Sequence, residues 1–137
     1  MTEPQRTPIY LPRESGRRYE LGAMQAVFKA DGAETGDRYS VSEWWLDPHS
    51  DGPGRHLHEA NDEIFIALVG RPSVLAGDRW YELETGSTIV IPAGIDHDFA
   101  NRTDERAALL NVFVPGGFET NMPEIVAWFA RQNETER

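Results

Sequence analysis

Three of the four histidines in this 137-residue chain lie in two segments where they can bind a metal ion. The first segment, residues 54–63, contains His56, His58 and Glu63. Residues two apart on a β-strand face the same side, so His56 and His58 are predicted to project together. Glu63 begins the next apolar run, and a hairpin would bring its carboxylate beside the imidazoles. An H-x-H pair alone also occurs by chance on exposed strands that bind no metal. The fourth histidine, His49, is interpreted as an exposed turn residue.

A further candidate ligand, His97, lies in the second segment, residues 86–101, which is rich in turn-forming glycine and proline. Imidazole nitrogen combined with carboxylate oxygen suits Fe(II), Mn(II), Ni(II), Cu(II) or Zn(II). The chain has no cysteine, so a cysteine-ligated zinc site and a disulfide framework are excluded. We therefore predict one divalent transition metal with four protein ligands: His56, His58, Glu63 and His97.

The remainder of the chain predicts an all-β domain over residues 19–116. Short runs rich in β-branched and aromatic residues are separated there by Gly, Pro, Asp and Asn. Strands are predicted at 20–29, 38–46, 54–58, 62–69, 72–76, 79–84, 88–91, 97–100 and 107–114. Short strands without a long helical period between them are typical of an antiparallel sandwich or a closed barrel.

The two ends of the chain are predicted to differ from this barrel. Residues 1–18 contain three prolines, which favour an extended N-terminal arm. Residues 117–137 are predicted to form a short helix and a tail, with Asn121 as a candidate N-cap. The apolar residues with helical spacing in this segment are Met122, Ile125, Val126 and Phe129.

The two histidine segments resemble the motifs of the cupin superfamily. Its first motif, G-x5-H-x-H-x(3,4)-E-x6-G, is matched through Gly70, although Ser50 stands at the position of the leading glycine. Its second motif, G-x5-P-x-G-x2-H-x3-N, is matched at every position by Gly86, Pro92, Gly94, His97 and Asn101. The resemblance implies a double-stranded β-helix, or jelly-roll barrel, with a short C-terminal helix and the metal inside one end.

Strand alternation predicts a set of apolar side chains on the same inward face as the ligands: Phe65, Ala67, Phe99 and Phe113. They are expected to line a substrate pocket, although each is also compatible with an ordinary barrel core. One of Trp44 and Trp45 should point inward, and alternation does not decide which. Asp96 and Asp98, which flank His97, are predicted to point away from it into solvent.

Composition excludes several classes of partner. Thirteen basic against 23 acidic residues give a net charge of −10, whereas nucleic acids and anionic lipids require a basic surface. No run approaches the ~20 apolar residues of a membrane-spanning helix. The first residues lack the apolar core of a signal peptide, so a cytoplasmic location is expected. A homodimer is expected because open sheet edges and an extended arm favour pairing.

Three functions remain open for such a site. The resemblance extends to small quercetin-dioxygenase-like cupins, which implies a metal-dependent oxidoreductase acting on a small phenolic or enolic molecule. Glu63 would then be both a metal ligand and a catalytic proton acceptor. The second function is that of a non-redox isomerase, cyclase or lyase, in which the metal polarises a carbonyl. The third is a small-molecule binding module without turnover.

Overall fold

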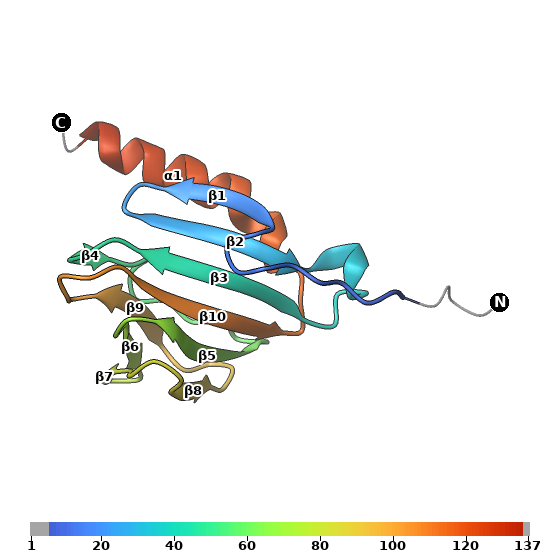
Figure 1. Cartoon of the computed structure of the whole chain (residues 1–137), viewed down its shortest axis with the longest axis horizontal. Helices are drawn as coiled ribbons and strands as arrows, with labels where there is room; N and C mark the ends of the chain where they lie inside the picture. The colour runs from blue at the N-terminus through green and yellow to red at the C-terminus, as the bar shows by residue number, and fades with distance from the viewer. Residues whose placement is uncertain (1–5, 136–137) are drawn as a thin grey trace.

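The computed structural model describes residues 6–135 of the chain, with side chains through residue 132. Its strands are β1 (Arg17–Leu21), β2 (Met24–Ala30), β3 (Ser40–Leu46), β4 (Ser50–Asp51), β5 (Asp62–Val69), β6 (Ser73–Ala76), β7 (Arg79–Glu82), β8 (Thr88–Ile91), β9 (His97–Asn101) and β10 (Ala107–Val114). They form a six-stranded sheet in the order β1-β2-β3-β10-β5-β8 and a four-stranded sheet in the order β4-β9-β6-β7. All strand pairs are antiparallel (Figure 1). The main hydrophobic core contains residues from both sheets. The predicted double-sheet jelly roll is confirmed.

Within residues 6–135, three helical segments accompany the sheets. A 3₁₀ turn, η1 (Gly32–Glu34), connects β2 to β3, and a second, η2 (Phe118–Asn121), follows β10. The helix α1 (Met122–Thr135) continues from η2 and runs alongside β1 at one edge of the large sheet (Figure 1). The predicted C-terminal helix is confirmed. No helix within residues 6–135 has the length and apolar character needed to cross a bilayer.

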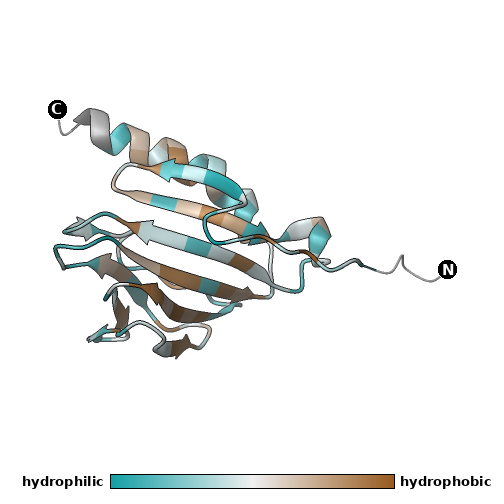
Figure 2. Cartoon of the chain, viewed as in Figure 1, coloured by the Kyte–Doolittle hydropathy of each residue, from teal (hydrophilic) through white to brown (hydrophobic). Residues whose placement is uncertain are grey.

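Strand alternation explains how the sheets position inward side chains. In β5, Glu63, Phe65 and Ala67 are buried, whereas the residues between them are partly exposed. Buried and partly exposed residues also alternate in the second half of β10. The two strands are neighbours in the large sheet and are coloured largely as hydrophobic in Figure 2. A period of two therefore places one row of side chains in the core and the next row on the outer face.

Two strand predictions are wrong. The run 20–29 forms two strands rather than one, because the chain reverses at Gly22, whose φ of +73° suits glycine. The run 54–58 is not a strand: it retains a single isolated bridge, between His56 and His97. Pro53 cannot donate a ladder hydrogen bond, and Gly54 has a positive φ, so the backbone here does not extend a sheet.

The described part of the N-terminal arm lies along its own barrel. Lys29 of β2 donates hydrogen bonds from Nζ to the carbonyl oxygens of Pro12 and Ser15, at 2.7 and 2.6 Å. The side chain of Arg6 reaches the carbonyl of Thr35 at 2.8 Å. The first strand already begins at Arg17, and residues 1–5 of the predicted arm and 136–137 of the predicted tail lie outside the described residues.

The expected homodimer stays a prediction. The outer face of the large sheet leaves Ile64 and Ile66 partly exposed, and Val90, on the edge strand β8, is 58% exposed. A second copy of the chain would cover such a face. Static light scattering at micromolar concentration should give about twice the 15.5 kDa mass of one chain. A monomeric mass under these conditions would contradict the prediction.

Candidate metal centre

Four potential ligand side chains meet between the two sheets. Glu63 comes from β5 and His97 from β9, whereas His56 and His58 lie in the irregular segment 52–61. Their ligand atoms all lie within 4.8 Å of one another. Metal–ligand bonds of 2.0–2.2 Å place two donors of one ion up to about 4.4 Å apart. The four residues singled out by the sequence thus form a cluster only slightly wider than one ion spans.

Backbone contacts with the second motif hold the segment that carries His56 and His58. The N–H groups of His56 and His97 each donate to the other residue's carbonyl, at 3.0 and 2.8 Å. The N–H of Gly94 donates to the carbonyl of His58 at 2.9 Å. The φ of Gly94 is +86°, a conformation that glycine adopts without strain. The turn at Gly94 therefore fixes the backbone of one ligand, although it lies far from that ligand in sequence.

The prediction that Asp98 points into solvent is wrong. Its Oδ1 accepts hydrogen bonds from the N–H groups of Gly54, at 3.1 Å, and Phe99, at 2.8 Å. Burial raises the pKa of this half-buried carboxyl group above its usual value. Asp98 thereby ties the segment before His56 to β9. Asp96, by contrast, does form a surface ion pair, with Arg55 at 2.8 Å.

The hydrogen bonds of His56 and His97 define which ring nitrogen has a lone pair available for a metal. His56 Nδ1 lies 2.6 Å from the carbonyl oxygen of Gly54, and His97 Nδ1 lies 3.0 Å from that of Ile95. A carbonyl only accepts, so in each ring Nδ1 carries the proton. In the neutral imidazole the lone pair is then on Nε2. Metal-binding histidines are oriented in this way, by donating their other nitrogen to a backbone carbonyl.

Three buried atoms in the cluster have no hydrogen-bond partner within the described part of the chain: His58 Nε2, Glu63 Oε2 and His97 Nε2. His97 Nε2 lies 2.5 Å from Glu63 Oε2, and His58 Nε2 lies 3.7 Å from the same oxygen. Two lone pairs that face each other at such a distance require a positive charge between them. A proton or a metal ion supplies it, so the donor set fits a divalent metal.

The pKa shifts of the histidines agree with a site that takes up either a proton or a metal ion. Burial alone lowers the pKa of His97, but contact with the Glu63 carboxylate outweighs it and raises that pKa above its usual value. For His58, burial lowers the pKa and outweighs the opposing effect of the Glu63 carboxylate, and the neighbouring His56 and His97 lower it further. His58 is therefore neutral near pH 7, which is the form that binds a metal.

Asn111 on β10 orients the carboxylate ligand, and the sequence reasoning missed it. Its Nδ2 donates to Glu63 Oε1 at 3.1 Å, and both side chains are buried. The bond fixes one carboxylate oxygen and leaves Oε2 directed at the histidines. The sequence does contain a signal for this role, because Asn111 is a single amide on the inward face of an otherwise apolar strand. Only the pairing of β10 with β5, which sets Asn111 opposite Phe65, reveals its partner.

A cavity of about 330 Å³ opens from the ligand cluster, at the small end of the 300–1,000 Å³ typical of ligand pockets. Phe65 and Phe99 line it, as expected, and Trp44 is the indole that faces inward. Trp45 lies on the opposite face, where the Arg106 guanidinium stacks on its ring at 4.2 Å.

The other two predicted pocket residues are placed differently. Ala67 is buried in the core and is not part of the cavity lining formed by the described residues, because its short side chain lies deeper along β5. Phe113 is not in that lining either, but its ring packs edge-on against His58 with centroids 5.0 Å apart. Phe113 therefore packs against the candidate metal ligand His58 and does not close the pocket.

The cavity has a wall that the sequence reasoning did not anticipate. Phe118 and Asn121 of η2 and Ile125, Trp128 and Phe129 of α1 line it opposite the sheets. The helical spacing of Ile125 and Phe129 was recognised, but it was used only to predict the helix and not a cavity wall. The spacing alone does not distinguish a helix face that packs on a core from one that borders a cavity.

Residues 42–113, more than half of the chain, match the family model described as the cupin domain. The chain is a cupin. Both motif segments and all four candidate ligands lie inside the matched range. A search of curated protein sequences found no significant match to this cupin.

Solved structures agree with the family assignment. The cupin superposes on KdgF from Halomonas sp. with a TM-score of 0.70 at 16% identity, covering 83% of this chain and 99% of that one. A predicted oxalate decarboxylase from Thermotoga maritima gives 0.69 at 16% identity, covering 80% and 99%. A sugar phosphate isomerase of the cupin superfamily from Silicibacter pomeroyi gives 0.64 at 22% identity, covering 77% and 74%. At these identities the likeness establishes the fold of this cupin.

Asn111 offers a test of how the cupin holds Glu63. Asn111→Leu keeps the approximate size of the side chain but removes the amide that donates to Glu63 Oε1. The Glu63 carboxylate is then less well oriented. Loss of such an outer hydrogen-bond partner typically costs 10–100-fold in metal affinity. We expect a decrease of that size, measured by competition with a coloured chelator. Asn61→Leu is the control, because its exposed amide donates to the Pro115 carbonyl and Asn61 does not belong to the ligand cluster. Equal affinity in the Asn111 and Asn61 variants would contradict the role.

Proposed function

We propose that this cupin is a metal-dependent oxidoreductase that binds a small phenolic or enolic molecule and uses dioxygen as the oxidant. The observation that carries the proposal is the position of the ligand cluster, at the end of a cavity whose remaining walls are largely aromatic and aliphatic. Four protein ligands leave one or two positions of a five- or six-coordinate ion for substrate and oxygen.

The lack of cationic side chains in the cavity lining formed by the described residues favours an apolar substrate over an anionic one. Among the described residues, none that lines it is a lysine or an arginine, and Glu63 is the one carboxylate in the lining. A phosphate or a dicarboxylate would enter with no cationic side chain to neutralise it. A phenol or enol carries its charge on the single oxygen that meets the metal, and its ring suits Phe65, Phe99 and Trp44.

The residues of the site have separate roles in this proposal. His56, His58, His97 and Glu63 would hold the metal, which when bound supplies a Lewis acid for the substrate oxygen and redox exchange with dioxygen. Glu63 Oε2 accepts the proton of the substrate hydroxyl, because this oxygen faces the cluster and Oε1 is engaged by Asn111. The aromatic walls exclude bulk water from the deprotonated substrate.

The native metal is the first test. The protein is purified without a chelator or a histidine tag, under anaerobic conditions, and its metals are measured by elemental analysis. We expect near-stoichiometric iron, nickel, manganese or copper, followed by oxygen consumption with some phenolic or enolic substrates. Stoichiometric zinc would favour a non-redox isomerase, cyclase or lyase instead. Protein without any metal would favour a binding module without turnover.

A further inference from the structure

We propose that the C-terminal segment, residues 118–129, is the specificity element of the cavity and selects ligands with an apolar body of more than one ring. This inference rests on the proposed binding of a small molecule at the metal cluster and adds to it the residues that discriminate among such molecules. Five of the fourteen lining residues among those described come from this segment, although it lies outside the matched cupin range.

The segment lies within reach of the ligand cluster. The ring of Phe118 is 5.8 Å from that of His58 and 5.1 Å from that of Phe113, centroid to centroid. It also lies 6.2 Å from the ring of Trp44. A molecule bound at the metal therefore meets Phe118 next to His58, and the same cavity continues to the side chains of α1.

The first turns of α1 are fixed to the barrel, so the wall is preformed. Met122 is fully buried, and Ile125 and Phe129, one turn apart, pack against the main core while lining the cavity. Trp128 lies on the same side of the helix and is 45% exposed, with its ring 4.9 Å from that of Phe129. A partly exposed indole in a cavity lining marks the mouth, where a ligand would cover it.

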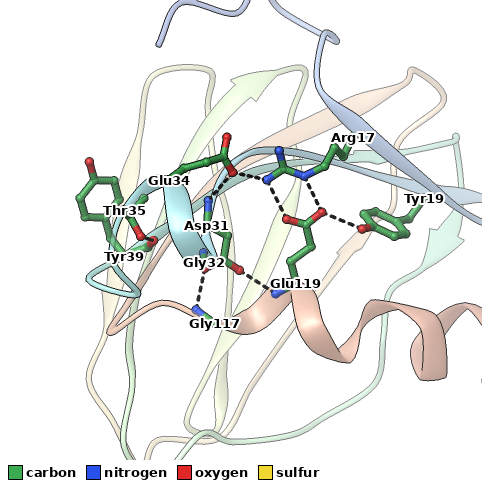
Figure 3. Close-up of polar contacts among 9 residues, drawn as sticks. All are labelled: Arg17, Tyr19, Asp31, Gly32, Glu34, Thr35, Tyr39, Gly117 and Glu119. Atoms are coloured by element: carbon green, nitrogen blue, oxygen red, sulfur yellow. Dashed lines mark hydrogen bonds and ion pairs between the residues drawn. The ribbon is translucent and has the colours of Figure 1, made fainter. Parts of the chain in front are cut away.

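A polar network holds the start of the segment (Figure 3). The buried Asp31 accepts hydrogen bonds from the N–H groups of Gly117, at 2.6 Å, and Glu119, at 2.7 Å. The Glu119 carboxylate receives two hydrogen bonds from Arg17, at 2.7 and 2.8 Å, and one from Tyr19, at 2.6 Å. Burial and this carboxylate raise the pKa of Tyr19 to about 12, so its hydroxyl remains a donor.

The wall has one polar side chain, that of Asn121, among otherwise apolar residues. A ligand that fills the cavity would therefore touch carbon surface over most of its length beyond the metal. Discrimination between a short and a long ligand arises at Ile125 and Trp128, which a single ring held at the cluster does not cover. Apolar pockets discriminate by about 10–200-fold for small differences in size.

The test compares two probes with the same chelating group, catechol and 2,3-dihydroxynaphthalene. Dissociation constants are measured anaerobically on the full-length protein loaded with Co(II), by its visible absorption. The ratio of the two constants cancels the metal contact and isolates the second ring. In the unmodified protein we expect the naphthalene probe to bind at least about tenfold more tightly. Trp128→Ala and Ile125→Ala should each reduce this ratio by about five- to tenfold.

Two matched variants serve as controls. Val126→Ala truncates a residue of the same helix that packs on the core without lining the cavity. Trp80→Ala removes an indole that stacks under Arg102 on the small sheet. Both should keep the ratio of the unmodified protein. An unchanged ratio in Trp128→Ala and Ile125→Ala would overturn the inference, as would a ratio near one in the unmodified protein.

A metal-free measurement separates this inference from the proposed function. Binding of 2-naphthol to the metal-free protein requires the wall but no metal, and we expect Trp128→Ala to weaken it by about tenfold. If the protein neither retains a metal nor consumes oxygen, the proposed oxidoreductase fails, while a dependence of 2-naphthol binding on Trp128 still supports the inference. Equal binding of 2-naphthol by Trp128→Ala and by the unmodified protein would overturn it.

Discussion

Replacing His97 or His56 with alanine is expected to remove most of the bound metal. Each substitution deletes a nitrogen whose lone pair is directed at the cluster by a hydrogen bond on the other side of the ring. Loss of a direct ligand should exceed the 10–100-fold cost typical of losing an outer hydrogen-bond partner, so we expect affinity to fall by more than about 100-fold. Elemental analysis after dialysis and chelator competition measure the change.

His49→Ala is the matched control for these variants. His49 is the one histidine outside the cluster, with its side chain 60% exposed beside Asp104. Its loss should leave the metal content unchanged. Circular dichroism and thermal unfolding must show that the His56 and His97 variants remain folded. Undiminished metal in both of these variants would refute the assignment of the site.

Glu63→Gln is expected to abolish most activity while the barrel remains folded. The amide keeps the volume of the carboxylate and can still accept the hydrogen bond from Asn111. It removes the negative charge that attracts a cation and the oxygen that would receive a proton from the substrate. General-base catalysis typically contributes 10²–10⁴-fold, so we expect the turnover of metal-saturated protein to fall by at least about 100-fold.

Saturation with metal separates the two roles of Glu63. Metal affinity is measured first, and turnover is then compared with both proteins fully loaded. Glu59→Gln is the control, since Glu59 is exposed in the segment before β5 and does not belong to the ligand cluster. Full activity of loaded Glu63→Gln would remove Glu63 from the chemistry and leave it as a ligand only.

The candidate ligand residues and the fold class could be predicted from sequence because their signals are local. His56 and His58 are two residues apart, and the turn residues around Gly94 have a backbone preference of their own. The alternation of β5 likewise depends on neighbouring residues, so the inward direction of Phe65 could be predicted. Local regularity misled the prediction at residues 54–58, where Pro53 and a positive φ at Gly54 leave one bridge instead of a strand.

The remaining features depend on contacts between distant parts of the chain. A period of two shows that Trp44 and Trp45 face opposite sides, but only the packing of β3 against the other sheet sets which one faces the cavity. Asn111 is 48 residues from Glu63 in sequence, so strand pairing alone brings them together. Strand alternation predicted that Asp98 faces solvent, but the segment before His56 packs over its side chain, with the N–H of Gly54 donating to Oδ1.

The sequence by itself therefore determined the candidate ligand residues, most of the strand pattern and the cupin family of this protein. The tertiary structure decided which atoms lack partners, which residues orient the ligands and which helix face borders the cavity. The physical reason is that ligand type and strand period are properties of neighbouring residues, whereas burial and hydrogen-bond satisfaction are properties of the packed molecule. The wall formed by Ile125, Trp128 and Phe129 depends on such long-range contacts, because Asp31 and Arg17 bond to Gly117 and Glu119 just before the helix and Met122 packs in the core.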